Sequence, residues 1–384
     1  TTSHSAILAR ALEIPAVLSV EGVASSLKNG DTVVVDGSEG AVIVNPDDNT
    51  VAEYSKKRDA FLAERKELEN YRGRETKSAS GEVYELFCNI GKPEDAVKAV
   101  DADGEGVGLF RTEFLFMDRT SIPTEDEQFE AYKKAALILK GKSLIIRTLD
   151  IGGDKDIPYL GLEKEENPFM GFRAIRYCLK NRELFKSQIK AILRASAFGD
   201  VKIMFPLITT MDELREGKKL VAECKADLRN MGINFNENIQ VGVMVETASA
   251  AVIADMLAKE ADFFSIGTND LTGYTMACDR GNNDVSYLYS PLQPSVLRMI
   301  KRTIECGVQN GISVGMCGEA AANKLMIPLL ISFGLTEFSV SAPSVLNVRK
   351  IISTWTKEEA DKVTAKVLEM STQQEIVEYL KSVV

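Results

Sequence analysis

Charged side chains follow short apolar stretches at several places in this sequence of 384 residues. Arginines come at the ends of two such stretches, Arg111 in LFRTEF and Arg147 in IIRTLDIGGDK. Carboxylates end two others, Glu246 in VMVET and Asp270 in SIGTND, and Cys317 ends a fifth in GMCGE. Guanidinium groups bind phosphate or carboxylate oxygens in pairs. This mixture of residue types indicates a small substrate that carries several negative charges.

The two carboxylates also suggest a metal. Mg²⁺ typically takes one or two protein carboxylates and completes its octahedron with water and substrate oxygens. Arginines and a divalent cation together stabilise a phosphoryl group in transfer. The sequence therefore predicts phosphoryl transfer with Mg²⁺ held by Glu246 and Asp270. Taken singly, each arginine could be a salt-bridged surface group and Glu246 a member of a buried ion pair.

Further candidates lie in the same segments. Arg173 and Arg280 fall in the stretches after the third and sixth apolar segments, and Asn269 directly precedes Asp270. Cys317 alone would be a small core residue. Its place in Met-Cys-Gly-Glu, where glycine lets backbone approach closely, makes a proton donor an equal alternative.

The only histidine is His4, in the run Thr1-Thr2-Ser3-His4-Ser5. A histidine near a helix start is usually a surface or capping residue. Helix N-terminal amides and hydroxyls also form an anion site, however, and a neutral imidazole can carry a phosphoryl group covalently. We therefore expect His4 to be a nucleophile. With no second histidine in the sequence, a multi-histidine metal site is excluded.

Short apolar strands alternate with longer amphipathic helices from about residue 82 onward. The expected strands are Val83–Asn89, Val107–Arg111, Ser143–Leu149, Val201–Leu207, Ile239–Glu246, Asp262–Gly267, Ile312–Cys317 and Glu337–Val340. The expected helices include Glu125–Leu139, Asp212–Met231, Ala248–Ala258 and Ser295–Asn310. Eight strands in this rhythm favour a (β/α)8 (TIM) barrel over an open doubly wound sheet. In such a barrel the strand ends, and with them the candidate residues, share one mouth.

The first 80 residues differ from the rest. Residues 1–50 are typical of the end of a small α/β unit, with strands expected at Thr32–Asp36 and Ala41–Val44. Residues 51–80 are dense in charge, which indicates a solvated linker helix. The barrel is expected over 81–384. Because the chain begins at Thr1 and the first unit is too small for a core of its own, we expect further sequence upstream.

Composition is that of an ordinary globular protein, with 45% hydrophobic and 27% charged residues. The net charge of −10 argues against a surface that coats nucleic acid. Uncharged runs are too short for a membrane span. The six cysteines show no paired or zinc-type spacing, which predicts a reducing, cytoplasmic location.

Several motifs resemble a known family. TTSHSAILARALEIPAV resembles the phosphohistidine (swivelling) domain shared by enzyme I of the bacterial sugar phosphotransferase system, pyruvate phosphate dikinase and phosphoenolpyruvate synthase. LFRTEFLF, RTLDIGGDK, NPFMGFRAIR, VGVMVETASA, SIGTNDLTGYTMACDRGN and GMCGEAA look like the phosphoenolpyruvate-binding barrel of the enzyme I family. The likeness extends over essentially the whole chain.

The resemblance implies roles residue by residue. It implies that His4 is the phosphorylated histidine and that Cys317 protonates the enolate of pyruvate. Arg111, Arg147, Arg173, Asn269 and Arg280 match positions that bind phosphoenolpyruvate in the family. Glu246 and Asp270 match its Mg²⁺ ligands. The resemblance also implies a homodimer formed through the barrel and a histidine phosphocarrier protein as partner, although the helical domain that docks this carrier is not in the sequence.

Two alternatives remain open at this point. The chain could be part of a dikinase or synthase, which would need a nucleotide-binding domain elsewhere. It could also be a non-catalytic module that senses phosphoenolpyruvate without relaying phosphate.

Overall fold

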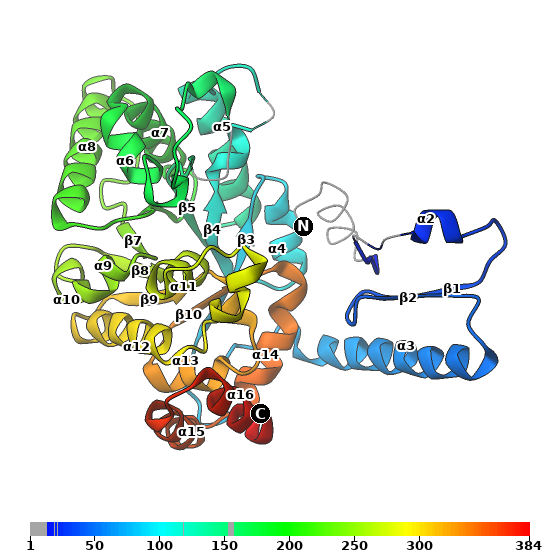
Figure 1. Cartoon of the computed structure of the whole chain (residues 1–384). Coiled ribbons are helices and arrows are strands. Elements are labelled where there is room, and N and C mark those ends of the chain that lie inside the picture. The colour runs from blue at the N-terminus through cyan, green and yellow to red at the C-terminus, as the bar shows by residue number, and fades with distance from the viewer. Residues whose placement is uncertain (1–13, 19, 21, 118, 153–156) are drawn as a thin grey trace. The chain divides into compact units, whose positions relative to one another are not determined.

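The computed structural model describes residues 14–384 except 19, 21, 118 and 153–156. The chain divides into two compact units, residues 1–70 and 71–384 (Figure 1). No helix in the described part of the chain is long and apolar enough to cross a bilayer.

The described part of the first unit contains helix α2 (Val23–Ser26), strands β1 (Val33–Asp36) and β2 (Ala41–Val44), and helix α3 (Asp48–Leu68). The two strands lie within the expected ranges and form an antiparallel hairpin. Asp36 Oδ1 closes that turn by accepting from the backbone N–H groups of Ser38 and Glu39 at 2.9 and 3.0 Å.

Helix α3 is solvated along its length. Asp47 caps its start by accepting from the Thr50 N–H at 2.7 Å. None of its residues is buried. Helix α3 occupies much of the expected linker 51–80. The division between the two units falls between residues 70 and 71, and the domain boundaries at 50 and 80 stay predictions.

The second unit is a closed barrel of eight parallel strands, which confirms the expected (β/α)8 fold. The strands run in the circular order β10-β3-β4-β5-β6-β7-β8-β9. They are β3 (Glu85–Ile90), β4 (Gly106–Arg111), β5 (Ser143–Arg147), β6 (Val201–Phe205), β7 (Val241–Val245), β8 (Phe263–Ile266), β9 (Ser313–Met316) and β10 (Glu337–Val340). Each lies within the predicted strand or differs from its ends by one or two residues.

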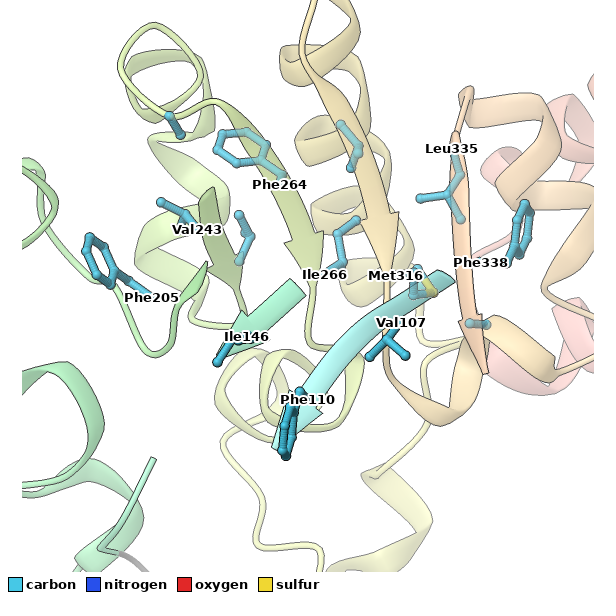
Figure 2. Packing of buried hydrophobic residues seen from close by; sticks show 14 of the residues in the cluster. Val107, Phe110, Ile146, Phe205, Val243, Phe264, Ile266, Met316, Leu335 and Phe338 are labelled. Atoms are coloured by element: carbon cyan, nitrogen blue, oxygen red, sulfur yellow. The ribbon is translucent and has the colours of Figure 1, made fainter. Parts of the chain in front are cut away.

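Helices surround the barrel (Figure 1). They are α4 (Asp95–Asp101), α5 (Glu125–Leu139), α6 (Ala174–Lys180), α7 (Arg182–Ala195), α8 (Met211–Asn230), α9 (Ala248–Val252), α10 (Ala254–Leu257), α11 (Thr268–Met276), α12 (Pro294–Gln309), α13 (Ile327–Phe333), α14 (Val345–Thr354), α15 (Lys357–Glu369) and α16 (Gln373–Val383). Side chains that point out of the barrel, such as Ile146, Val243 and Phe264, pack beneath these helices (Figure 2).

The prediction of one helix over Ala248–Ala258 was wrong, because this segment forms α9 and α10 with Ile253 between them. The guanidinium of Arg302 donates to the Val252 carbonyl at 2.7 and 3.0 Å. That carbonyl therefore has a partner from α12, and the Met256 N–H donates to Ile253 instead at 2.9 Å. A contact distant in sequence divides the helix.

Candidate active site

The period of two along a strand places Arg147 at the barrel mouth. On β5, Leu144 and Ile146 belong to the outer core, whereas Ile145 belongs to the small cluster inside the barrel. Arg147, two residues after Ile145, points to the same inner side at the C-terminal end of the strand. Since all eight strands are parallel, their C-terminal ends form one rim.

The same alternation places Glu246. Met244 on β7 points into the barrel, and Glu246 follows two residues later, just beyond the strand end. Glu246 is 2% exposed, and its Oε1 accepts from the Leu207 N–H at 2.7 Å. Met244 Sδ accepts from Arg147 Nη1 at 3.5 Å, which links the two strand ends.

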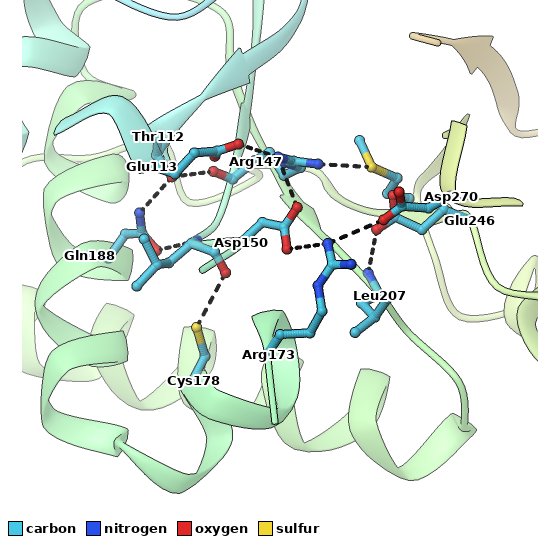
Figure 3. A network of polar contacts seen from close by, with 12 residues as sticks. Thr112, Glu113, Arg147, Asp150, Arg173, Cys178, Gln188, Leu207, Glu246 and Asp270 are labelled. Carbon is cyan, nitrogen blue, oxygen red and sulfur yellow. Dashed lines mark hydrogen bonds and ion pairs between the residues drawn. The ribbon is translucent and has the colours of Figure 1, made fainter. Parts of the chain in front are cut away.

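Two buried arginines share one carboxylate at the mouth (Figure 3). Arg147 Nη2 contacts Asp150 Oδ2 at 3.0 Å, and Arg173 Nη2 donates to Asp150 Oδ1 at 2.8 Å. Arg147 also donates to Glu113 Oε1 at 2.6 Å, and Arg173 donates to Asp270 Oδ2 at 3.2 Å. The loop after β5 and the start of α11 are thus joined by ion pairs, which bring Arg147, Arg173 and Asp270 together.

These contacts keep both arginines charged. Burial lowers the pKa of each guanidinium, but the neighbouring carboxylates outweigh burial and raise it. The Nε atoms of Arg147 and Arg173 are buried and have no hydrogen-bond partner within the described residues. A buried donor left without a partner is costly. An anionic ligand at the mouth would give these donors acceptors.

The carboxylates of Glu246 and Asp270 suit a hard divalent cation. Burial raises the pKa of Glu246 to about 8, and the charges of Asp270 and Asp150 add to the shift. A cation between carboxylates would relieve this repulsion, and oxygen donors are what Mg²⁺ prefers. In the described ranges no three His, Cys, Asp or Glu side chains gather as a metal site. Mg²⁺ usually completes its coordination with water and substrate oxygens.

The start of α11 packs tightly against the end of β9. A Cβ atom added at Gly318 would lie 1.7 Å from Thr268 Oγ1 and 2.9 Å from Thr268 N. The Thr268 hydroxyl is buried without a hydrogen-bond partner among the residues that the structure describes. The glycine thus lets the first turn of α11, with its N–H groups, stand directly beside Cys317.

Asn269 and Arg280 lie near this turn. Tyr289 donates its hydroxyl to the Asn269 carbonyl at 2.9 Å. Burial raises the pKa of Tyr289 to about 12, while Arg280 lowers it and Asp270 raises it further. Tyr289 therefore contacts the first turn of α11 through the backbone of Asn269.

Cys317 is 3% exposed and belongs to the cluster inside the barrel. Burial raises the pKa of its thiol to about 11, whereas Arg147 and Arg111 oppose that shift. At neutral pH the thiol therefore carries its proton. Leu109 on β4 also belongs to this inner cluster, so Arg111, two residues later at the end of the strand, points to the same inner side as Arg147.

His4 lies outside the described residues, so its expected role remains a prediction. The sequence analysis missed Glu113 as a partner of Arg147, although the residue stands in the quoted motif LFRTEF. The signal available for Glu113 was its position, two residues past the end of a strand. Tyr274, which accepts from Arg173 Nη1 at 3.3 Å, had no such signal.

Two family profiles match the chain. One is described as PEP-utilising enzyme, PEP-binding domain, and it matches residues 65–356. The other is described as PEP-utilising enzyme, mobile domain, and it matches residues 1–40. Because the first match covers most of the chain, including the whole strand barrel, the class is that of the PEP-utilising enzymes.

Curated relatives narrow the class. The phosphoenolpyruvate-protein phosphotransferase of Bacillus subtilis (strain 168) is 51% identical over 380 residues, covering 99% of this chain and 67% of that protein. That of Staphylococcus carnosus (strain TM300) is 48% identical over 380 residues, covering 99% and 66%. The chain belongs to the phosphoenolpyruvate-protein phosphotransferases, which are transferases. It spans about two thirds of the length of these relatives.

These relatives favour a phosphotransferase over a dikinase or a non-catalytic module. Among solved structures, a citrate lyase from Burkholderia xenovorans superposes with a TM-score of 0.44 at 12% identity, covering 81% of this chain and 93% of that one. That likeness is too low to bear on function.

Proposed function

We propose that the barrel mouth binds phosphoenolpyruvate and that the phosphoryl group passes to His4, releasing pyruvate. The observation that carries the proposal is the convergence of Arg147, Arg173, Glu246 and Asp270 at one mouth. The family to which the chain belongs supports the same reaction.

The arginines supply the charge that a phosphoryl group needs. Ion pairs already fix Arg147 and Arg173, so they require little rearrangement when charge develops in the transition state. Arg111, Arg280 and Asn269 are proposed to complete the set around the substrate. The first turn of α11 adds backbone N–H groups, which suit an anionic group.

Glu246 and Asp270 are proposed to hold Mg²⁺. When bound, the ion would neutralise charge on the substrate oxygens and help to orient them. The cation would also allow Glu246 to stay ionised in spite of its burial.

Cys317 is proposed as the acid that completes the reaction. Loss of the phosphoryl group leaves the enolate of pyruvate, which needs a proton on its methylene carbon. A thiol with a pKa of about 11 holds its proton at neutral pH and can deliver it to a carbanion-like centre.

The wider setting is also a proposal. By resemblance to the enzyme I family, phosphohistidine at position 4 would pass its group to a histidine phosphocarrier protein in sugar uptake, and the barrel would mediate a homodimer. All six cysteines are free, which fits a reducing cytoplasm.

The decisive experiment replaces His4 in the complete protein. His4→Ala should abolish labelling by phosphoenolpyruvate that carries radioactive phosphate, while calorimetry shows unchanged substrate binding. The label on the wild-type protein should be acid-labile, as a phosphoramidate is. Arg298→Ala, on the exposed side of α12, serves as a control that should label normally. Labelling that survives His4→Ala would exclude His4 as the nucleophile.

A further inference from the structure

A buried serine inside the barrel has no evident structural reason to be polar. Ser265 on β8 is 0% exposed, and its hydroxyl has no hydrogen-bond partner within the described residues. Burying a hydroxyl without a partner costs about 1–3 kcal/mol relative to an apolar group. Alanine would fill nearly the same space without that cost.

The alternation along β8 points Ser265 toward the barrel interior. Phe263 belongs to the inner cluster, whereas Phe264 and Ile266 belong to the outer core. The inner cluster consists of Leu109, Ile145, Met204, Met244, Phe263 and Cys317. Cys317 is the member of this cluster that has a proton to share.

The backbone of Cys317 is held from two sides. Its N–H donates to the Ile266 carbonyl on β8 at 3.1 Å. Its carbonyl accepts from Asn89 Nδ2 at 3.0 Å, and Ser339 Oγ fixes Asn89 by donating to Asn89 Oδ1 at 2.7 Å. The position of the Cys317 backbone is therefore set, and the remaining freedom is the orientation of its thiol.

Ser265 and Cys317 are neighbours on the inner face of the barrel, because Ser265 pairs with Gly315 of β9 and Cys317 follows Gly315 two residues later on the same side. The thiol donates a long hydrogen bond to the Ile266 carbonyl, with a distance of 3.8 Å from Sγ to the oxygen. Burial raises the thiol pKa, and the Ser265 hydroxyl is the largest influence that opposes burial, ahead of Arg147. Arg111 acts in the same direction, and Glu246 acts against it. In the resting state the hydroxyl and the thiol are not aligned as a full hydrogen bond, as is common before substrate binds.

We propose that Ser265 is a positioning residue for the proton donor. Its hydroxyl orients the Cys317 thiol toward the enolate and donates a hydrogen bond to the thiolate once the proton has left. The S–H bond breaks, the enolate electron pair forms the new C–H bond of pyruvate, and the thiolate later takes a proton from water. This inference rests on the function proposed above for Cys317.

The test compares three variants of the complete protein. Ser265→Ala removes the hydroxyl, Ser265→Thr keeps it, and Ser143→Ala removes another buried, unpartnered hydroxyl, at the N-terminal end of β5. Pyruvate formation gives kcat and KM, thermal unfolding gives stability, and peptide mass spectrometry follows the modification of Cys317 by a small methanethiosulfonate.

We expect Ser265→Ala to lower kcat about tenfold to hundredfold, the effect of losing one hydrogen bond to a charged group, with KM nearly unchanged. Cys317 should also react more slowly with the reagent, while the melting temperature stays the same or rises. Ser265→Thr should recover most of kcat, and Ser143→Ala should match the wild type in kcat.

Unchanged kcat and unchanged thiol reactivity in Ser265→Ala would overturn this inference alone. So would a loss of kcat that follows a lower melting temperature and that threonine does not restore, because that pattern is structural. Wild-type turnover in Cys317→Ala would overturn the proposed role of the cysteine, and this inference with it.

Discussion

At the scale of single residues, the mouth is organised before any substrate arrives. Asp150 contacts both Arg147 and Arg173, at 3.0 and 2.8 Å, so one carboxylate sets the spacing of two cations. Such preorganisation lowers the reorganisation needed when negative charge develops. The geometry of the guanidinium fork, as well as its charge, is therefore important here.

Arg147→Lys tests the importance of that geometry. Lysine keeps the charge but cannot contact Glu113, Asp150 and the substrate with one planar group. We expect binding of phosphoenolpyruvate to weaken about tenfold or more, measured by calorimetry. Arg298→Lys on the exposed side of α12 is the matched control and should bind normally. Equal affinities for the two variants would show that charge alone suffices at position 147.

Cys317→Ala tests the proposed acid. The change removes the proton source without removing charge at neutral pH, because the thiol pKa lies near 11. Pyruvate formation should fall about a hundredfold or more, within the usual range for a general acid, while substrate binding changes little. Cys278→Ala, at a half-buried position away from the inner cluster, should behave as the wild type. Unaltered turnover would remove Cys317 from the reaction.

The sequence could predict part of this site. Arg111, Arg147 and Glu246 follow apolar strands directly, so strand periodicity and the barrel rule predict that they lie together. Ser265 carries no such local signal, and Glu113 is marked only by its position two residues past a strand end. Their roles depend on which side chains from other strands they meet, and this information is absent from a single strand pattern.

At the scale of elements, close packing of strand ends and helix starts shapes the mouth. Gly318 follows Cys317 and lies against Thr268, the first residue of α11. Any side chain at this position would push the helix start and the strand end apart. The distance between the proposed acid and the proposed Mg²⁺ ligand Asp270 therefore depends on this glycine.

Gly318→Ala should consequently reduce activity more than stability. The added methyl group would force Thr268 to move, and both its backbone nitrogen and its hydroxyl are in the way. We expect kcat/KM for pyruvate formation to fall at least about tenfold, the effect of misplacing reacting groups by a fraction of an ångström. Gly199→Ala, where the nearest contact would be 3.3 Å, is the control. A normal rate for Gly318→Ala would show that α11 can shift freely.

A second feature of the elements is an acid at the opposite end of the barrel. Glu337 begins β10, is 5% exposed, and burial raises its pKa to about 8, with Glu85 adding to the shift and Lys202 opposing it. Glycines on two other strands leave space for the Glu337 side chain. A Cβ at Gly108 would lie 2.3 Å from Glu337 Oε1, and one at Gly315 would lie 2.9 Å from its Cδ.

This acid should make stability depend on pH. The folded state keeps the Glu337 proton up to about pH 8, whereas the unfolded chain releases it near 4.5. The stability that this group contributes is therefore complete below pH 4.5 and is lost as pH rises toward 8. Relative to the wild type, the free energy of unfolding of Glu337→Gln should therefore rise over that pH range, by about 1.4 kcal/mol for each unit of pKa shift.

Denaturant unfolding at several pH values measures the difference. Glu358→Gln, at an exposed position of α15 where Glu358 pairs with Lys362, is the matched control for the loss of a carboxylate. A difference between Glu337→Gln and wild type that does not change with pH would mean that Glu337 is ionised in the folded protein.

The elements themselves were largely predictable, because short β-rich segments and amphipathic stretches alternate regularly after residue 82. The division of Ala248–Ala258 into α9 and α10 was not. It depends on Arg302, some 50 residues further on, whose guanidinium occupies the Val252 carbonyl. Helix propensity within this segment cannot predict a contact with a residue so distant in sequence.

At the scale of the whole molecule, the barrel unit includes residues before its first strand. Arg349 on α14 is 2% exposed, and its Nε donates to Thr76 Oγ1 at 3.0 Å and its Nη1 to the Tyr71 carbonyl at 3.1 Å. It also pairs with Asp103, which accepts from the Gly73 N–H at 2.7 Å. The segment 71–80 therefore supplies acceptors to a buried cation of the barrel.

Truncated chains should reveal this dependence. Residues 71–384 should unfold cooperatively and bind phosphoenolpyruvate, because the apolar core and the predicted arginines all lie within that range. Residues 81–384 leave Arg349 buried with fewer partners and should be less stable by several kcal/mol. Thermal and denaturant unfolding measure the difference. Equal stability of the two chains would support the predicted boundary at residue 80.

The pair of glycines around Glu337 has an evolutionary consequence. Positions 108, 315 and 337 share one small volume, so none of them can change its size independently of the other two. Homologues that place a short side chain at 337 are free to carry alanine at 315, while those that retain the glutamate are not. Alanine at 108 requires a change at 339 as well, because a Cβ at Gly108 would lie 2.5 Å from Ser339 Oγ. Correlated replacement at positions 108, 315, 337 and 339 would therefore reveal, from sequences alone, how the interior of this barrel is filled.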